Sequence, residues 1–389
     1  MNKLTLPMPD VGLSHPLIFS YCATFLPREM LHVYRQVTGV SRFENWVLTR
    51  TRANPASFPY SRLLVLNKHP FRALRRLWYR AQSRAVPLHA SEVSQALVWA
   101  AEHRARLLHI YLGSEALRAL PLLRAFPGAR IVSFHGADLS HEFTPADYAK
   151  LWPQADLFLC RSESLRRDLL VKGCPADRIR LNFTGVPLPE NALPRVAPVG
   201  RPVRLLQVCR FIDKKGLDVT IHAARRLLDQ GVPMQLVLAG AGPAEANLRQ
   251  LTEQLGLIDE VRFAGFTSGE ALAQLYRESD LFLHPSRETS RGDREGIPNS
   301  ILEAMAHALP VISTQHSGIP EAITHGVNGL LLEAAKPDLL ASAILSLLRD
   351  QSLFGRISAG ARHRIETSFS TEKCIEQLEK HYEEALAMH

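Results

Sequence analysis

The feature that most constrains the fold is a regular alternation of short apolar runs with amphipathic segments in the second half of the chain. The apolar runs, which we interpret as strands, are VRLLQVC, MQLVLAG, VRFAGF, DLFLHPS and LPVIST, between residues 203 and 314. The amphipathic segments, which we interpret as helices, lie at 216–229, 244–255, 268–277 and 298–308. Continuous apolar strands alternating with helices are typical of a parallel sheet buried between helices. The pattern predicts a doubly wound α/β domain.

The first half of the chain repeats this pattern less regularly. Helices are expected near 89–104, 115–124 and 163–172. The expected strands are HPLIFSYC, NWVLTR, RLLVLN, RLLHIYL, ARIVSFHG and DLFLCRS. A Pro-rich segment, GVPLPENALPRVAPVGRPVR at 185–204, disfavours regular structure and is interpreted as a linker. The 389 residues are enough for two such domains, with a ligand cleft expected between their strand ends.

Composition excludes several classes of protein. With 46% hydrophobic and 22% charged residues, the chain is globular rather than disordered. No apolar run reaches the roughly 18–20 residues that a membrane-spanning helix needs, and the N-terminus makes a poor signal peptide. The five cysteines are scattered without a CxxC pair, which argues against a disulfide framework and a zinc site. We therefore expect a cytoplasmic protein.

Positive charge is concentrated in the first half. Residues 1–190 contain 25 Lys and Arg against 14 Asp and Glu, a net charge of +11, which suggests an anionic partner there. The segment HPFRALRRLWYRAQSRAV at 69–86 has one basic and one apolar-aromatic side, which suits a helix lying on anionic lipid. An ordinary amphipathic helix packed on the sheet explains it equally well. The residues of this membrane or acceptor patch are Arg72, Arg75, Arg76, Trp78 and Arg80.

The stretch EGIPNSILEAMA, residues 295–306, predicts a helix that starts at Pro298. The amides of the next three residues, Asn299, Ser300 and Ile301, would lack helical acceptors and could bind an anion. Two carboxylates, Glu295 and Glu303, bracket this helix start. The alternative is that Glu295 only complements the helix dipole and Glu303 is a surface residue.

Two further motifs follow strands of the second domain. Arg210 and Lys215 come directly after its first strand, where two cations could neutralise a diphosphate without a metal. A solvated basic loop is the alternative. Gly240 and Gly242 would permit close backbone approach to a ligand, or simply form a tight βα turn.

His135 ends a strand of the first domain and is followed at once by glycine, a better position for a cleft role than for a satisfied polar residue. The sequence contains no DxD, HExxH, GxSxG, Walker A or kinase motif. We therefore predict no metal site.

In this order and spacing the motifs resemble the retaining glycosyltransferases of family four (glycosyl transferases group 1). These have the GT-B fold, two Rossmann-like domains facing each other across a cleft. The resemblance is strong from about 130 to 350. It implies an acceptor-side domain over 1–190, a nucleotide-sugar-binding domain over 191–371, and a terminal helix, 372–389, packed back on the first. It rests on HGAD at 135–138, ADLFLCRSESLRRDLLVKGCPADRIRLNFTGV, RFIDKKG, GAGP, DLFLHPS before EGIPNSILEAMA, and SGIPEAITHGVNGLLL.

The resemblance also implies roles for individual residues. Glu303 would take the ribose hydroxyls and Glu295 the donor sugar. Arg210 and Lys215 match the family's diphosphate-binding pair, and His135 matches an active-site histidine near the donor sugar. The segment near the sugar and diphosphate comprises Gly296, Ile297, Pro298 and Asn299. One departure is SYCATFLPRE at 20–29, which lacks the Gly-Gly pair of many members.

The implied reaction is metal-independent transfer of a hexose, with retention, from a UDP- or GDP-sugar to a glycan, without a cofactor. RETSRGDR at 287–294 and STQHSGIPE at 313–321 resemble exopolysaccharide glycosyltransferases of the colanic-acid type. That likeness implies a lipid-linked oligosaccharide acceptor and peripheral association with the inner face of the cytoplasmic membrane, without nucleic acid. Two alternatives stay open: a soluble transferase for a small-molecule acceptor, and a non-catalytic GT-B scaffold that binds membrane or nucleic acid.

Overall fold

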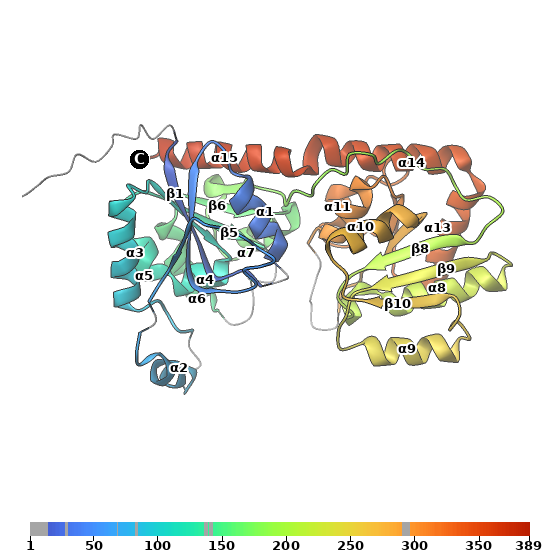
Figure 1. The fold of residues 1–389 in the computed structure, drawn as a ribbon, viewed down its shortest axis with the longest axis horizontal. Helices are drawn as coiled ribbons and strands as arrows, with labels where there is room; N and C mark the ends of the chain where they lie inside the picture. The colour runs from blue at the N-terminus through green and yellow to red at the C-terminus, as the bar shows by residue number, and fades with distance from the viewer. Residues whose placement is uncertain are drawn as a thin grey trace, which may run out of the picture. The chain divides into compact units, whose positions relative to one another are not determined.

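The computed structural model consists of two parallel β-sheets with helices packed on them (Figure 1). It describes residues 15–27, 30–67, 69–81, 85–135, 139, 143–289 and 296–389, apart from the side chains of Arg72 and Arg80. Glu295, with the rest of 290–295, and the residues 136–138 after His135 lie outside this described part.

The first sheet has seven strands in the order β3-β2-β1-β4-β5-β6-β7. Its central strand β4 is buried along its whole length, as expected when helices cover both faces of a parallel sheet. The strands are β1 Leu17–Phe25, β2 Glu44–Arg52, β3 Leu63–Val65, β4 Leu107–Tyr111, β5 Ala129–Phe134, β6 Leu157–Cys160 and β7 Ile179–Leu181. The helices are α1 Leu31–Gly39, α2 Arg72–Ala81, α3 Ala90–Glu102, α4 Gly113–Arg118, α5 Leu120–Ala125, α6 Pro145–Leu151 and α7 Glu163–Val171.

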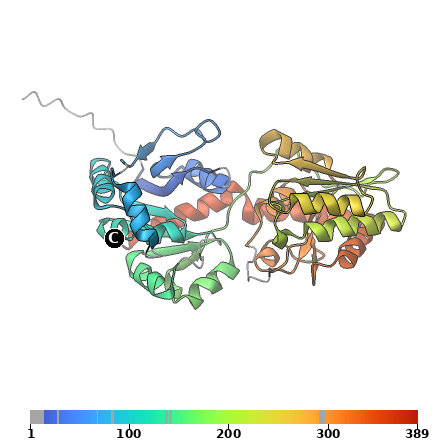
Figure 2. The same ribbon diagram turned by 90° about the horizontal axis from the view of Figure 1, so that it is seen from below.

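The second sheet has six parallel strands in the order β10-β9-β8-β11-β12-β13. The strands are β8 Val203–Val208, β9 Met234–Ala239, β10 Val261–Gly265, β11 Leu281–His284, β12 Val311–Thr314 and β13 Leu330–Leu332. Its helices are α8 Leu217–Asp229, α9 Glu245–Gln254, α10 Gly269–Glu278, α11 Asn299–Ala306, α12 Ile319–Ala322, α13 Pro337–Arg349 and α14 Gln351–Arg364. Figure 2 shows helices on both faces of this sheet. Accordingly, neighbouring residues Leu205 and Leu206 belong to different apolar cores.

The strand order of the second sheet reverses between β8 and β11, which pair with each other. The loops after such neighbouring strands diverge to opposite faces, and the crevice between them is where open α/β sheets bind ligands. The segment with Lys215 follows β8, and the segment leading to α11 follows β11. The topology therefore brings the two predicted donor-binding motifs to one edge of one sheet.

The predicted α/β architecture is confirmed, and each of the eleven predicted strands is present. The helix predicted at 115–124 is instead two short helices, α4 and α5, that meet at Ala119. Pro121 explains the break, because proline has no amide to continue the helical bonding and is favoured in a first turn. The three-residue strands β7 and β13 were not predicted.

Contacts divide the chain into two compact units, one of Met1–Ser133, Ser140–Phe158 and Leu378–His389, the other of Phe134–Leu139 and Leu159–Gln377. In the first unit the end of α15 Thr371–Ala387 packs on the sheet, where Glu379 accepts the backbone amides of Ser41 and Arg42 at 2.7 and 2.8 Å. Residues 182–202 contain no helix or strand. Among the described helices, none is long and apolar enough to cross a bilayer.

Candidate functional site

A tight turn directly after β8 carries the two predicted diphosphate ligands. Lys215 is buried, with 8% of its surface exposed, whereas Arg210 is exposed. The Lys215 carbonyl oxygen accepts a hydrogen bond from Gln207 Nε2 at 2.8 Å, and Gln207 Oε1 in turn accepts one from Thr220 Oγ1 at 2.6 Å. The backbone of Lys215 is therefore held by two buried side chains that come from β8 and α8.

The same turn is packed against the segment that follows β11. Gly216 has φ +63, and a Cβ at this position would lie 2.0 Å from the carbonyl oxygen of Pro285. The Arg287 amide donates to the Lys214 carbonyl at 2.9 Å, and Arg287 Nη1 contacts Asp218 at 2.9 Å. Since β8 and β11 are neighbours in the sheet, these contacts hold the loop that follows β8 against the loop that follows β11.

Buried polar groups lie beside Lys215 at the end of β11. His284 is completely buried, and burial together with the Lys215 charge lowers its pKa well below the usual value, so its imidazole is neutral. Within the part of the chain that the structure describes, neither ring nitrogen of His284 nor the hydroxyl of buried Ser286 has a hydrogen-bond partner. Buried polar groups of this kind are usually hydrogen-bonded to protein or to ordered water.

The helix with Glu303, α11, begins at Asn299, one residue later than predicted, because Pro298 has an extended ψ of 126 and acts as the N-cap. The amide of Ile301 donates to the Pro298 carbonyl at 3.1 Å. The prediction that Ile301 offers its amide to an anion is therefore wrong, and Asn299 and Ser300 are the helix-start amides that could serve. Glu303 is half-buried on this helix.

The backbone of the predicted donor segment is held by two residues that the sequence did not single out for this purpose. Arg161 Nη2 donates to the Ile297 carbonyl at 3.1 Å and to Asn299 Oδ1 at 3.3 Å. Gly318 approaches so closely that a Cβ there would lie 3.0 Å from the carbonyl carbon of Gly296. A charged residue directly after a buried strand was the available signal for Arg161, but its target lies 136 residues away.

The structure gives Gly240 and Gly242 a conformational role. A Cβ on Gly240, where φ is +142, would lie 1.9 Å from the carbonyl oxygen of Cys209. A Cβ on Gly242 would lie 2.4 Å from that of Phe211. Both positions require glycine because backbone carbonyl groups of the protein lie where a Cβ would stand. The alternative interpretation, a tight βα turn, therefore explains both glycines without a ligand. Their contact with a ligand stays a prediction.

His135 lies half-buried directly after β5, and the division by contacts assigns Phe134–Leu139 to the same unit as Lys215. Its role stays a prediction. In the described part of the chain, no group of three or more His, Cys, Asp or Glu side chains is arranged to hold a metal ion.

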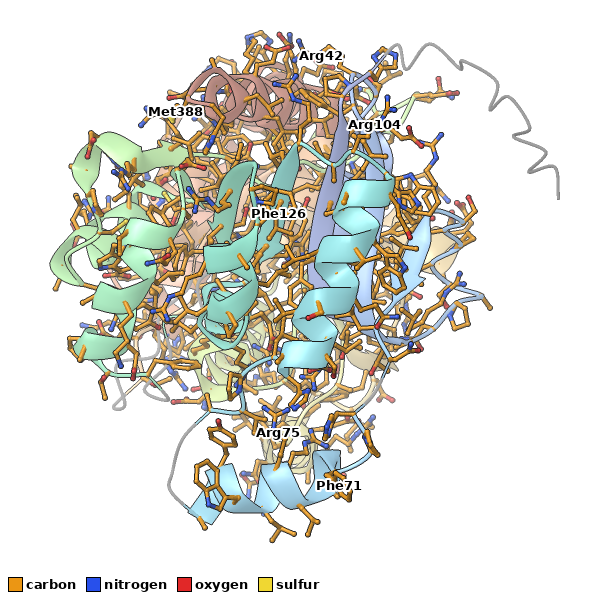
Figure 3. The ribbon with its side chains drawn as sticks, turned by 90° about the vertical axis from the view of Figure 1, so that its left-hand side faces the viewer. Arg42, Phe71, Arg75, Arg104, Phe126 and Met388 are labelled. Atoms are coloured by element: carbon orange, nitrogen blue, oxygen red, sulfur yellow. The ribbon has the colours of Figure 1, made fainter. Side chains whose placement is uncertain are left out.

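Helix α2 carries the predicted membrane or acceptor patch and stands away from the first sheet (Figures 1 and 3). Its large apolar side chains are exposed, with 56% of Trp78, 68% of Leu77 and 63% of the preceding Phe71 accessible. Arg75 contacts the chain through the Pro87 carbonyl, at 3.2 Å. This exposure argues against the alternative of an amphipathic helix packed on the sheet. The side chains of Arg72 and Arg80 lie outside the described part.

The sequence is similar to those of known glycosyltransferases. Residues 192–364 match the family model "Glycosyl transferases group 1". The chain is 34% identical over 304 residues to the amylovoran biosynthesis glycosyltransferase AmsK of Erwinia amylovora, covering 77% of this chain and 74% of that protein. It is 33% identical over 316 residues to the putative colanic acid biosynthesis glycosyltransferase WcaL of Escherichia coli K12, covering 79% and 77%.

Two solved structures are similar over nearly the whole chain. Anabaena Alr3699/HepE in complex with UDP has a TM-score of 0.75 at 19% identity, covering 95% of this chain and 100% of that one. Sucrose-phosphate synthase from Thermosynechococcus elongatus has a TM-score of 0.74 at 19% identity, covering 96% and 100%. At such identities the likeness shows the fold alone, which is GT-B, with two Rossmann-like domains.

Proposed function

The chain belongs to the glycosyl transferases group 1 family and is a glycosyltransferase, and from this premise we propose how it works. It takes a hexose from a UDP- or GDP-sugar, without a metal, and transfers it with retention to a glycan of surface polysaccharide synthesis. The observation that carries the proposal is buried Lys215, fixed at the sheet edge that also leads to the start of α11.

The proposed chemistry stabilises a departing diphosphate. As the bond between the sugar C1 and the diphosphate oxygen breaks, negative charge builds up on that oxygen. Lys215 and Arg210 neutralise it, and the amides at the start of α11 add their hydrogen bonds and the helix dipole. A buried, fixed cation is worth more here than a mobile one, because it is already oriented when the charge develops.

In the proposed single-step route to retention, the acceptor hydroxyl approaches C1 on the face from which the diphosphate leaves. A bond then forms between C1 and the acceptor oxygen, and the acceptor proton passes to the departing diphosphate. No separate base is needed for this proton transfer. The carboxylates Glu295 and Glu303 bind neutral hydroxyls of the sugar and the ribose, so they do not oppose the anion between them. His135 lies near the donor sugar.

The proposed acceptor is a lipid-linked oligosaccharide. The relatives are named for amylovoran and colanic acid biosynthesis, and the exposed apolar side chains of α2 lie beside Arg75 and Arg76. A helix that joins apolar side chains to cations favours an anionic membrane surface, where such an acceptor resides. A soluble transferase for a small acceptor would bind no vesicles.

A donor panel tests the proposed function. Thermal unfolding is measured with UDP-, GDP- and ADP-sugars in EDTA, followed by slow donor hydrolysis. One uridine or guanosine donor should raise the melting temperature, since binding to the native state stabilises it by mass action, and should be hydrolysed. Lys215→Ala should lose both effects, and Lys214→Ala is the matched control that keeps them. A requirement for a divalent ion, or equal behaviour of the two variants, would contradict the proposal.

A further inference from the structure

We infer that Tyr276 positions the carboxylate of Glu303 and so contributes to recognition of the nucleoside ribose, with Arg195 holding Tyr276 in place. This inference rests on the proposed function, since it requires that Glu303 bind the ribose hydroxyls. Neither Tyr276 nor Arg195 belongs to the motifs that carry the family resemblance to a donor site. Both act through another residue, so they are positioning residues rather than catalytic ones.

The phenol of Tyr276 contacts Glu303 directly. Tyr276 lies in the last turn of α10 with 2% of its surface exposed. Its hydroxyl donates to Glu303 Oε2 at 3.3 Å, and the carbonyl oxygen of Ser300 lies further away, at 3.5 Å. A carboxylate rotates freely about its last bond unless a partner fixes it. A hydrogen bond to one of its oxygens sets the plane of the group and hence the direction in which the carboxylate accepts ligand hydroxyls.

The ring of Tyr276 has little freedom. It stacks on the ring of His307, with centroids 5.1 Å apart and an interplanar angle of 19°, and lies 6.0 Å from the ring of Phe282. His307 is the C-cap of α11, the helix that carries Glu303. Burial, followed by the charges of Arg195, Arg277 and Arg362, lowers the pKa of His307 to about 4, so the stacked ring is neutral near pH 7.

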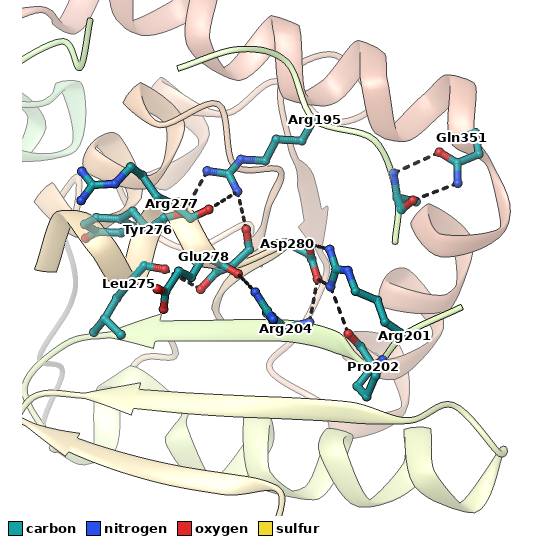
Figure 4. Close-up of polar contacts among 12 residues, drawn as sticks. Arg195, Arg201, Pro202, Arg204, Leu275, Tyr276, Arg277, Glu278, Asp280 and Gln351 are labelled. Atoms are coloured by element: carbon teal, nitrogen blue, oxygen red, sulfur yellow. Dashed lines mark hydrogen bonds and ion pairs between the residues drawn. The ribbon is translucent and has the colours of Figure 1, made fainter. Parts of the chain in front are cut away.

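Arg195 fixes the two helices relative to each other. Figure 4 shows its guanidinium beside the C-terminal end of α10. Its Nη2 donates to the carbonyls of Tyr276 at 2.9 Å and His307 at 3.1 Å, and its Nη1 donates to that of Arg277 at 3.1 Å. The last carbonyls of a helix have no helical partners and carry the negative end of its dipole, so one cation caps α10 and α11 together.

Arg195 is itself anchored, because its amide donates to Ser358 Oγ on α14 at 2.7 Å. Each side chain in the series of contacts from Arg195 through Tyr276 to Glu303 is thus held by hydrogen bonds. The segment from Arg195 to Arg201 is also held at its other end, by a contact that does not involve Tyr276. Arg201 pairs with both carboxylate oxygens of Asp280 at 2.7 Å (Figure 4), which makes it a suitable control.

The test measures discrimination against a missing ribose hydroxyl. Dissociation constants are determined by calorimetry for UDP and 2′-deoxy-UDP, and for GDP and 2′-deoxy-GDP, and the base that binds the wild type more tightly is used. A site that hydrogen-bonds a hydroxyl rejects the analogue that lacks it. Tyr276→Phe removes the phenolic oxygen alone and should reduce the ribose preference roughly three- to tenfold, as expected for the loss of one orienting hydrogen bond.

Two controls separate positioning from stability. Tyr60→Phe removes a hydroxyl of the other compact unit that donates to the Asn45 carbonyl at 2.7 Å, and Arg201→Gln weakens the anchor at Asp280. Both variants should keep the wild-type preference. Arg195→Lys should reduce the preference if the protein folds, and Tyr276→Phe carries the test if it does not. An unchanged preference in Tyr276→Phe, with a loss in Glu303→Gln, would overturn the inference alone. An unchanged preference in Glu303→Gln would overturn both the inference and the proposed role of Glu303.

Discussion

Lys215 owes its position to its backbone. Gln207 holds its carbonyl oxygen, and the following residue, Gly216, allows the turn to lie against Pro285. A lysine on an exposed loop would have to be ordered when the donor binds, with a loss of side-chain entropy. Lys215 is already buried, so most of this ordering takes place on folding.

Gly216 offers a direct test of this arrangement at the residue scale. Gly216 and Gly256 have almost the same φ, +63 and +62, but only Gly216 faces a neighbour where a Cβ would stand. Both alanine substitutions should lose about 1–2 kcal/mol of unfolding free energy for the left-handed backbone. Gly216→Ala should lose at least twice as much in chemical denaturation and should weaken nucleotide diphosphate binding. Equal losses in the two variants would contradict the close approach.

The charged members of the proposed site could be named from the sequence, whereas the residues that position them could not. Arg210, Lys215 and Glu303 stand out because charges at strand ends and helix starts have few structural explanations. Arg195 and Tyr276 bond to a carbonyl and a carboxylate more than 25 residues away. The packing of the helices determines such partners, and no local sequence pattern predicts that packing.

Among the elements, α2 differs most from its neighbours. Helices such as α8 and α13 bury a row of apolar side chains, whereas α2 exposes Leu74, Leu77 and Trp78. Exposed apolar side chains of this size commonly mark an interaction surface.

Vesicle sedimentation tests this element. The wild type should sediment with phosphatidylglycerol vesicles and not with phosphatidylcholine vesicles. The double variant Arg75→Gln/Arg76→Gln should bind about thirtyfold more weakly, because each basic residue near an anionic surface contributes about 1 kcal/mol. Arg356→Gln, on α14, is the control and should bind as the wild type does. Binding that is insensitive to the charges of α2, or absent, would favour the soluble transferase.

Helices and strands were predicted correctly where the hydrophobic pattern extends over many residues. The strands of both sheets and helices such as α8 and α9 could be predicted because several turns or alternations repeat the same signal. The strands β7 and β13 were not predicted, because they span three residues each and no longer apolar run marks them. The equally short β3 was predicted because it lies in a run of four apolar residues, Leu63 to Leu66. The break at Ala119 depends on a single proline whose effect on a helix varies with its position in the first turn.

At the scale of the whole molecule, the last helix of the chain, α15, contacts the first compact unit with its C-terminal end. Within the first compact unit, His109 Nδ1 lies 2.8 Å from the Tyr382 hydroxyl on α15, and its Nε2 lies 2.5 Å from Ser133 Oγ. The two-domain architecture followed from the alternating pattern. The resemblance implied that the terminal helix packs on the first domain, but this pair of residues could not be predicted, because its partners are 273 positions apart in the sequence and leave no local signal.

His109 makes the stability of this unit depend on pH. Burial, and then the nearby His381, lower its pKa to about 3 from the usual 6.5. Below pH 6.5 the unfolded chain therefore binds a proton that the folded state resists, so stability is lost as pH falls from about 6.5 towards 3. His109→Gln should show a shallower fall in unfolding free energy over this range, measured by denaturant titration. His15→Gln, at an exposed position, should keep the wild-type slope; equal slopes in all three proteins would contradict the assignment.

The central claim is that a nucleotide diphosphate leaves from a site built around Lys215, without a metal. The most direct measurement is the rate of nucleoside diphosphate release from the preferred sugar donor in EDTA, for the wild type and for folded Lys215→Ala. The account predicts turnover in the wild type and a loss of roughly 10²–10³-fold in the variant, the usual effect of removing one preorganised group that stabilises developing charge. Undiminished release by Lys215→Ala, or none by the wild type until a divalent ion is added, would contradict it.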